Sequence, residues 1–151
     1  MSRKKQGQPE LLESVYQTIN AIFPDKGIMR RIAKAESNEG KAPGTHRPGY
    51  YGGVFQVDRI AFDDIQAQIA QNDKHFIKQS QRIQDKLGID ISQAHWEDLN
   101  YNPLLSGLFG RLELSRFAES IPDSVEGQAK YWKKYYNKSG AGTEKHFMDA
   151  Q

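Results

Sequence analysis

The chain has no cysteine, which excludes disulfide bonds and metal sites built on thiolates. Its four histidines show neither the His-x-x-x-His nor the Glu-x-x-His spacing of a helical metal site. The Gly-x-Ser-x-Gly elbow of serine hydrolases is missing, and so are the glycine-rich phosphate loops of nucleotide-binding proteins. We therefore expect a protein that holds no metal and no cofactor.

Long apolar runs are also missing, so the sequence predicts no membrane-spanning helix. The basic start Ser2-Arg3-Lys4-Lys5 is followed by polar residues and not by the apolar stretch of a signal peptide, so we expect no signal peptide. The 21 Lys and Arg residues nearly balance the 19 Asp and Glu residues. A net charge of +2 argues against a protein that coats nucleic acid, and we expect no nucleic-acid partner.

The length of 151 residues fits one domain, and the spacing of apolar residues is helical along most of the chain. We predict a mainly α domain over 9–151 that follows a flexible tail over 1–8. Seven to eight helices should surround a central apolar helix over 104–117. Seven Gly or Pro residues within the sixteen positions 38–53 predict a long loop, and residues 54–57 could form at most a minimal β-element.

Glu36 is the main candidate for chemistry. With a cap at Asp25, Ile28, Ile32, Ala35 and Glu36 fall on one stripe of a helix, so the carboxyl points where the apolar side chains point. Burial and the negative end of the helix dipole both disfavour the carboxylate, which predicts a raised pKa. A carboxyl that keeps its proton near neutral pH suits general acid catalysis of glycosidic cleavage. The alternative is a side chain that turns out to solvent.

Three motifs carry a family resemblance: Glu36-Ser37-Asn38 followed by Gly52-Gly53-Val54-Phe55-Gln56-Val57, then Asn102-Pro103 through Gly107, then Tyr135-Tyr136-Asn137 with Gly140. In this order they resemble the motifs of lytic transglycosylases and goose-type lysozymes. Two departures stand out. Val-Phe replaces Leu-Met before Gln56, and one extra residue precedes Gly140.

The resemblance implies a lysozyme-like fold that cleaves the β-1,4 bond between N-acetylmuramic acid and N-acetylglucosamine in peptidoglycan. Glu36 would protonate the bridging oxygen and then act as a base, which leaves a 1,6-anhydro sugar. A single carboxylate suffices for that lytic transglycosylase reaction, whereas hydrolysis normally requires a second. A true lysozyme using Asp58 or Glu39 as its second carboxylate is the alternative.

The resemblance also implies substrate-binding roles, and each has a structural alternative. Gln56 could bind sugar or satisfy loop backbone, Tyr136 could contact Glu36 or belong to the core, and Asn137 could bind substrate or cap a helix. Ser37 could bind substrate or cap locally. Tyr50, Tyr51 and Phe55 could form walls that stack on sugar rings, or could anchor the loop.

The chain resembles phage-encoded wall-degrading domains, which implies action on the bacterial wall from a virion or after release at lysis. The expected partners are peptidoglycan glycan strands and other virion, tail or baseplate proteins. A non-catalytic virion protein with a lysozyme-like fold is a rival reading. A small nucleic-acid-binding protein is a weaker alternative, suggested by the lysines between 130 and 145. Such a group of lysines is usually a solvent-exposed face of a helix.

Overall fold

The structure, a computed structural model, describes residues 9–151, so the predicted flexible tail over 1–8 lies outside the described residues. Within this range the chain forms seven α-helices and two short 3-10 helices and no strand, which confirms the mainly α class. In chain order these are α1 (Pro9–Ile22), α2 (Ile28–Ser37), α3 (Arg59–Ala70), α4 (Lys74–Leu87), η1 (Ile91–Gln93), η2 (Trp96–Asn100), α5 (Pro103–Leu114), α6 (Val125–Tyr135) and α7 (Glu144–Asp149).

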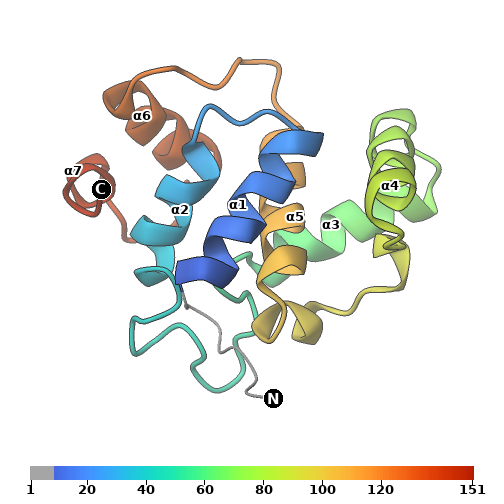
Figure 1. Cartoon of the computed structure of the whole chain (residues 1–151), viewed down its shortest axis with the longest axis horizontal. Coiled ribbons are helices and arrows are strands. Elements are labelled where there is room, and N and C mark those ends of the chain that lie inside the picture. The colour runs from blue at the N-terminus through green and yellow to red at the C-terminus, as the bar shows by residue number, and fades with distance from the viewer. Residues whose placement is uncertain (1–8) are drawn as a thin grey trace.

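Helix α5 is the centre of the fold, as its apolar sequence predicts. It contacts α1, α2, α3 and η2, and buried side chains lie on all of its faces. Figure 1 shows α1 and α5 side by side in the middle, with α2, α6 and α7 on one side and α3 and α4 on the other. The helix ends at Leu114, with Ser115 as its C-cap, and not at 117 as expected. The helices around α5 thus form two groups with the central helix between them.

The two glycines of α5 allow close packing. A Cβ on Gly107 would lie 2.4 Å from Cδ1 of Ile19 and 2.9 Å from Cε2 of Phe55. A Cβ on Gly110 would lie 3.1 Å from the hydroxyl oxygen of Tyr136. The neighbours are side chains and not backbone, so the glycines make room for the groups that surround the site.

Polar side chains cap the N-termini of four helices. Asp73, Asn102, Ser124 and Thr143 each accept a hydrogen bond from a backbone N–H in the first turn of α4, α5, α6 and α7. Asp25 does not cap α2 as expected. Gly27 occupies the N-cap position with φ 82°, and the Asp25 carboxylate accepts from the Gly27 N–H just outside the helix.

The Gly- and Pro-rich segment 38–53 is a long loop, and 54–57 continues it as a turn, so the minimal β-element is absent from the described residues. The turn closes through hydrogen bonds from Gln56 N to Gly53 O and from Val57 N to Gly52 O. Side chains of other elements bind its remaining backbone groups: Ser106 Oγ donates to Gly52 O, and Trp96 Nε1 donates to Val57 O. Because the backbone has these partners, it needs no neighbouring strand.

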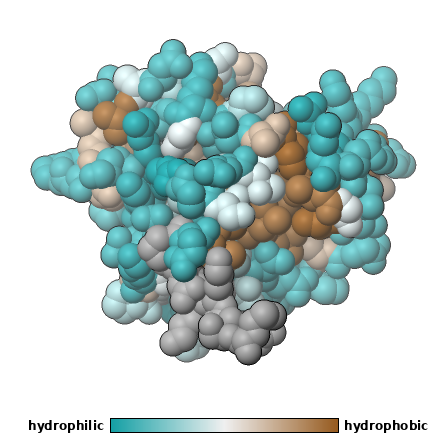
Figure 2. Space-filling view, in the orientation of Figure 1, coloured by the Kyte–Doolittle hydropathy of each residue, from teal (hydrophilic) through white to brown (hydrophobic). Residues whose placement is uncertain are grey.

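The surface in the orientation of Figure 1 is mostly hydrophilic. The largest hydrophobic patch that Figure 2 shows on this face lies between the α1–α5 pair and α4. No helix among residues 9–151 is both long and apolar enough to cross a membrane.

Candidate active site

Glu36 lies in the last turn of α2, one residue before the helix ends at Ser37. Ile28, Ile32 and Ala35 on the same stripe are buried, and Glu36 is half-buried beside them. Asn38 follows in the left-handed conformation, with φ 48°, and turns the chain away into the loop. The carboxyl therefore stays against the protein instead of turning out to solvent.

Two donors from the C-terminal part of the chain hold one oxygen of this carboxyl. Trp132 Nε1 donates to Oε2 of Glu36 at 2.9 Å, and Asn137 Nδ2 donates to the same oxygen at 3.3 Å. Both hydrogen bonds found among residues 9–151 go to Oε2. With Oε2 accepting both bonds, Oε1 is the oxygen left to carry a proton.

Burial raises the pKa of Glu36 from 4.5 to about 7 and outweighs the two hydrogen bonds, which favour the carboxylate and lower the pKa. The negative charge of Asp58 raises the pKa further, and His146 lowers it. His146 lies close because its Nε2 is 2.7 Å from Ala35 O on α2. A carboxyl of this pKa is partly protonated at neutral pH, as the sequence predicts, and can serve as both acid and base.

The carboxyl of Glu36 lines a small cavity of about 180 Å³. The walls come from the end of α2, the long loop, the start of α3 and the segment after α6. The lining residues are Glu36, Arg47, Tyr50, Gln56, Asp58, Tyr136, Asn137, Ser139 and Gly140. Five residues proposed from the sequence besides Glu36 thus meet here: Tyr50, Gln56, Asp58, Tyr136 and Asn137.

Gln56 is held by the loop. Its Nε2 donates to Thr45 O at 3.0 Å and to Gly53 O at 2.9 Å, while its Oε1 accepts from Arg47 at 2.9 Å. These contacts match the alternative in which the amide satisfies loop backbone, although the side chain also lines the cavity. Gln56 has a positive φ of 49°, and the hydrogen bonds of its side chain stabilise that conformation.

Tyr136 is buried and does not contact Glu36 by a hydrogen bond. Its hydroxyl donates to Phe55 O at 2.5 Å and so ties the segment after α6 to the turn over 53–56. The backbone N–H of Asn137 donates to Trp132 O at the end of α6, which matches the capping role. Its side chain donates to Glu36, a contact that the sequence did not predict, and substrate binding by Asn137 stays a prediction. The two neighbours therefore fasten the acid and the loop to the same helix end.

Of the two candidates for a second carboxylate, only Asp58 lines the cavity. It is exposed, stands at the start of α3 and accepts a hydrogen bond from Tyr50 at 2.9 Å. Glu39 is not among the lining residues, and its carboxylate accepts from Tyr16 on α1 at 2.8 Å. Of the two, Asp58 is therefore the carboxylate that shares a cavity with Glu36.

Two other proposed contacts, those of Phe55 and Ser37, require correction because both side chains are buried, and Tyr51 matches the loop-anchoring alternative. The Phe55 side chain is fully buried against Tyr16 and α5, so it belongs to the core and cannot stack on a sugar. Ser37 is 1% exposed, and its hydroxyl donates to Val54 O and accepts from Gly40 N, which ties the loop to α2. Tyr51 packs edge-on against Trp96 and anchors the loop.

Sequence reasoning missed Trp132 as a partner of the acid and Arg47 as part of the cavity wall, whereas Tyr50 lines the cavity as the sequence predicts. The Arg47 guanidinium lies 3.7 Å from the centre of the Tyr50 ring, and Tyr50 in turn holds Asp58. A signal existed for Trp132, since a buried indole N–H nearly always finds an acceptor. No pattern in the sequence says which acceptor that is.

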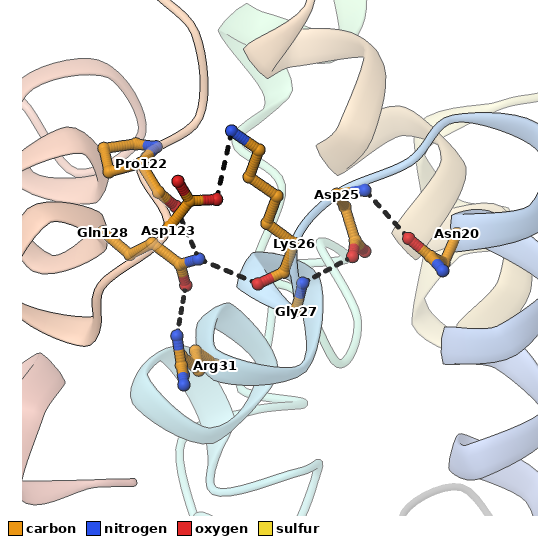
Figure 3. A network of polar contacts seen from close by, with 8 residues as sticks. All are labelled: Asn20, Asp25, Lys26, Gly27, Arg31, Pro122, Asp123 and Gln128. Carbon is orange, nitrogen blue, oxygen red and sulfur yellow. Dashed lines mark hydrogen bonds and ion pairs between the residues drawn. The ribbon is translucent and has the colours of Figure 1, made fainter.

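A polar network fixes α6, the helix that carries Trp132, onto the start of α2 (Figure 3). Gln128 is fully buried, and its Nε2 donates to Lys26 O and Pro122 O, each at 2.9 Å, while its Oε1 accepts from Arg31 at 2.9 Å. Lys26 also pairs with Asp123 at 3.3 Å. Because Gln128 lies one helical turn before Trp132, this network sets the position from which the indole reaches Glu36.

A second, larger cavity of about 700 Å³ adjoins the first, and the two share Asp58, Tyr136 and Ser139 in their walls. It also contains Glu113 of α5, which is buried. Within residues 9–151 there is no cluster of three or more His, Asp or Glu side chains that could hold a metal ion. The site therefore consists of a half-buried acid, its two donors, a second carboxylate and an adjoining hollow.

Comparison with known proteins gives this site no precedent: no family model matches the chain, and neither a curated protein nor a solved structure is significantly similar to it.

Proposed function

We propose that the chain cleaves the β-1,4 bond between N-acetylmuramic acid and N-acetylglucosamine in peptidoglycan, with Glu36 as general acid and base. The observation that carries the proposal is the half-buried Glu36 carboxyl, whose pKa of about 7 leaves a proton for transfer inside a cavity. The order of the three sequence motifs supports the choice of substrate. A single residue of this kind is the least that glycosidic cleavage requires.

The first step transfers the Glu36 proton from Oε1 to the bridging oxygen, and the bond from that oxygen to C1 of the muramic sugar breaks. Positive charge develops on C1, and the carboxylate that remains keeps its two hydrogen bonds to Trp132 and Asn137. In the second step the carboxylate takes the proton of the muramic C6 hydroxyl as that oxygen bonds to C1. The product is a 1,6-anhydro sugar, Glu36 regains its proton, and no water is consumed.

Hydrolysis is the second candidate, and the position of Asp58 favours it. Asp58 lines the same cavity as Glu36, is exposed, and its charge contributes to the raised pKa of Glu36. In that reaction Asp58 would activate or hold the attacking water, and the product would carry a reducing end. We place the transglycosylase first because Tyr50 already holds Asp58 to the loop, which suits a structural role.

The test is clearing of a peptidoglycan suspension by the purified protein and by its Glu36→Gln variant, which is nearly isosteric. The expected result is clearing by the parent and none by the variant, with thermal stability unchanged or higher. Mass spectrometry of the released fragments separates the two reactions, because anhydro and reducing ends differ by one water. Clearing that survives Glu36→Gln would refute the assignment, and a folded parent with no activity would favour a non-catalytic virion protein.

The variant Asp58→Asn separates the two reactions a second time. A transglycosylase should keep most of its activity and still release anhydro ends, whereas a hydrolase should lose activity on the order of a hundredfold or more. We also propose that the enzyme reaches the wall from a virion or after lysis, with virion proteins as partners. The resemblance to phage wall-degrading domains supports this part of the proposal.

A further inference from the structure

Lys133, in the last turn of α6, holds the segment that follows this helix. Its ammonium group donates to the backbone O of Asn137 at 3.0 Å, to the side-chain Oδ1 of Asn137 at 3.3 Å and to the backbone O of Gly140 at 2.9 Å. An ammonium group has three N–H donors and no acceptor, so the three oxygens match its donors. Lys133 therefore fastens both the backbone and the amide of Asn137.

The hydrogen bond to Oδ1 decides which way the Asn137 amide faces. A side-chain amide carries an acceptor, the C=O, and a donor, the NH2, which are of nearly equal size. The shape of the surroundings therefore distinguishes poorly between the two orientations. Because an ammonium group can only donate, it binds Oδ1, and Nδ2 is the group that reaches Oε2 of Glu36 at 3.3 Å.

The absence of a side chain at Gly140 makes room for this arrangement. A Cβ on Gly140 would lie 2.6 Å from Oδ1 and 2.8 Å from Nδ2 of Asn137, which is too close for a methyl group. The backbone between the two residues turns, with a hydrogen bond of 3.3 Å from Gly140 N to Asn137 O. The turn brings the amide and the Gly140 carbonyl to the same ammonium group.

The opposite orientation of the amide would affect the acid differently. Nδ2 stabilises the carboxylate of Glu36, and this hydrogen bond lowers the pKa of the acid. With Oδ1 in its place, the amide would present a partial negative charge that repels the carboxylate and accepts a hydrogen bond from the protonated acid. The orientation of Asn137 therefore determines which protonation state of Glu36 the amide favours.

We propose that Lys133 is a positioning residue, which orients the Asn137 amide so that its donor and not its acceptor faces Glu36. The inference rests on the proposed function for the role of Glu36 as an acid. It deepens that function by naming a cation that controls the acid through a neighbour. Lys133 itself is not among the residues that line the Glu36 cavity.

The test measures the pKa of Glu36 by NMR titration of its side-chain carboxyl carbon in the full-length protein, without substrate. Lys133→Met removes the ammonium group and keeps an unbranched side chain. The position is only partly buried, so we expect the variant to fold. Lys130→Met removes an exposed lysine about one turn earlier on α6 and is the matched control for loss of charge.

In Lys133→Met we expect the pKa of Glu36 to rise by about one pH unit, since the amide loses the partner that orients it. Lys130→Met should change it by less than about 0.3 of a pH unit, because solvent screens an exposed charge. An unchanged pKa of Glu36 in Lys133→Met, or an equal change in both variants, would overturn the proposal.

A second pair of proteins separates the orientation of the amide from the charge of the lysine. Loss of a nearby positive charge by itself raises the pKa of a carboxyl. That effect should persist in the Asn137→Ala background, whereas an effect of orientation should vanish there because no amide remains. We therefore expect Lys133→Met to shift the pKa of Glu36 by less than about 0.3 of a pH unit in Asn137→Ala. Equal shifts in the two backgrounds would contradict the proposal.

Other titratable and charged groups also face the Glu36 carboxyl. They come from the loop, the start of α3, the segment after α6, and α7, and they are Arg47, Tyr50, Asp58, Tyr136 and His146. All of them are the same in the parent and in the four variants. Differences between the titrations therefore report the changes at Lys133, Lys130 and Asn137.

The two proposals fail in different ways, because the titration requires no substrate. A folded wild-type protein that does not cleave peptidoglycan refutes the proposed function, whatever the titration shows. A protein that cleaves peptidoglycan but has the same Glu36 pKa with and without the Lys133 ammonium group refutes only this inference.

Discussion

Trp132 donates a hydrogen bond of 2.9 Å to Glu36, a residue 96 positions earlier in the chain. The bond stabilises the ionised carboxylate and so opposes burial, which stabilises the neutral acid. The pKa of about 7 is the balance of these effects. A substitution that changes either the burial of Glu36 or its hydrogen bonds should therefore shift its pKa.

The first prediction concerns the pH dependence of activity. Glu36 must carry a proton to start the reaction, so the cleavage rate should fall as pH rises through about 7. Initial rates of clearing across a pH series measure this decrease, which is the alkaline limb of the pH profile. A rate that instead stays constant up to pH 9, well above this pKa, would show that Glu36 is not the general acid.

The second prediction concerns Trp132→Phe, which removes the indole donor and keeps a ring in the core. The pKa of Glu36 should rise, because a bond that lowers it is lost, and the alkaline limb should move to higher pH. The free energy of unfolding should fall by about 1 kcal/mol, since the Glu36 carboxyl loses the shorter of its two hydrogen bonds.

The matched control for that variant is Trp96→Phe, which removes another buried indole donor, here to Val57 O at 2.9 Å. It should also lower stability, but the midpoint of the alkaline limb should stay where it is. If both variants shift the midpoint equally, the effect comes from general loosening and not from the hydrogen bond to Glu36.

The third prediction concerns stability against pH. The pKa values of Glu36 and Glu113 rise from 4.5 in the unfolded chain to about 7 and about 8 in the folded one. The unfolded chain therefore binds fewer protons between these values, so the contribution of these two groups to stability is fully present below about pH 4.5 and is lost as pH rises toward 8. Each group costs at most about 1.4 kcal/mol per pH unit in its interval.

Thermal unfolding of the parent and of Glu113→Gln checks this prediction. The variant cannot ionise at position 113, so its melting temperature should exceed that of the parent at pH 8 by more than at pH 5. A constant difference between the two proteins over that range would contradict the assignment of a neutral Glu113.

The fourth prediction concerns Gly53, where the turn before Gln56 passes η2. Its φ is +72°, and a Cβ would lie 2.1 Å from Leu99 O, which is backbone and cannot move aside. Gly53→Ala should therefore lower the free energy of unfolding by more than about 1 kcal/mol. Gly44→Ala in the same loop meets nothing within 4 Å and has no positive φ, so denaturant unfolding should show little change for it.

The fifth prediction concerns the network of Figure 3. Gln128→Leu keeps the volume of the side chain but leaves the carbonyls of Lys26 and Pro122 without their donor. Stability should fall by about 1–3 kcal/mol, and activity should fall as well because α6 carries Trp132. A destabilised variant with full activity at a temperature where it is folded would show that the network does not position the indole.

Much of the fold could be predicted from the sequence because its signals are local. The caps at Asp73, Asn102, Ser124 and Thr143 act on backbone within three residues, and the apolar stripe of α2 fixes which way Glu36 points. The apolar run after Pro103 likewise identifies the central helix. Caps and apolar stripes of this kind depend only on residues that are close together in the sequence.

The rest of the site depends on contacts between distant segments. Phe55 resembles a loop aromatic in the sequence, yet the space opposite Gly107 and Gly110 takes it into the core. Glu113 stands between Leu112 and Leu114 in the most apolar helix, and that setting is a signal of a buried acid. Which groups would face it depends on how α3 and α6 pack on α5, and no local pattern encodes that packing.

The division of the acid and its donors between early and late segments has a consequence for synthesis. A nascent chain that has emerged only through α5 contains Glu36 but not yet the Trp132 indole and the Asn137 amide that donate hydrogen bonds to its carboxyl. Trp132 and Asn137 leave the ribosome only after α5, so the carboxyl acquires its two hydrogen-bond donors only then. Products that stop at the end of α5 should therefore carry Glu36 without the two groups that lower its pKa.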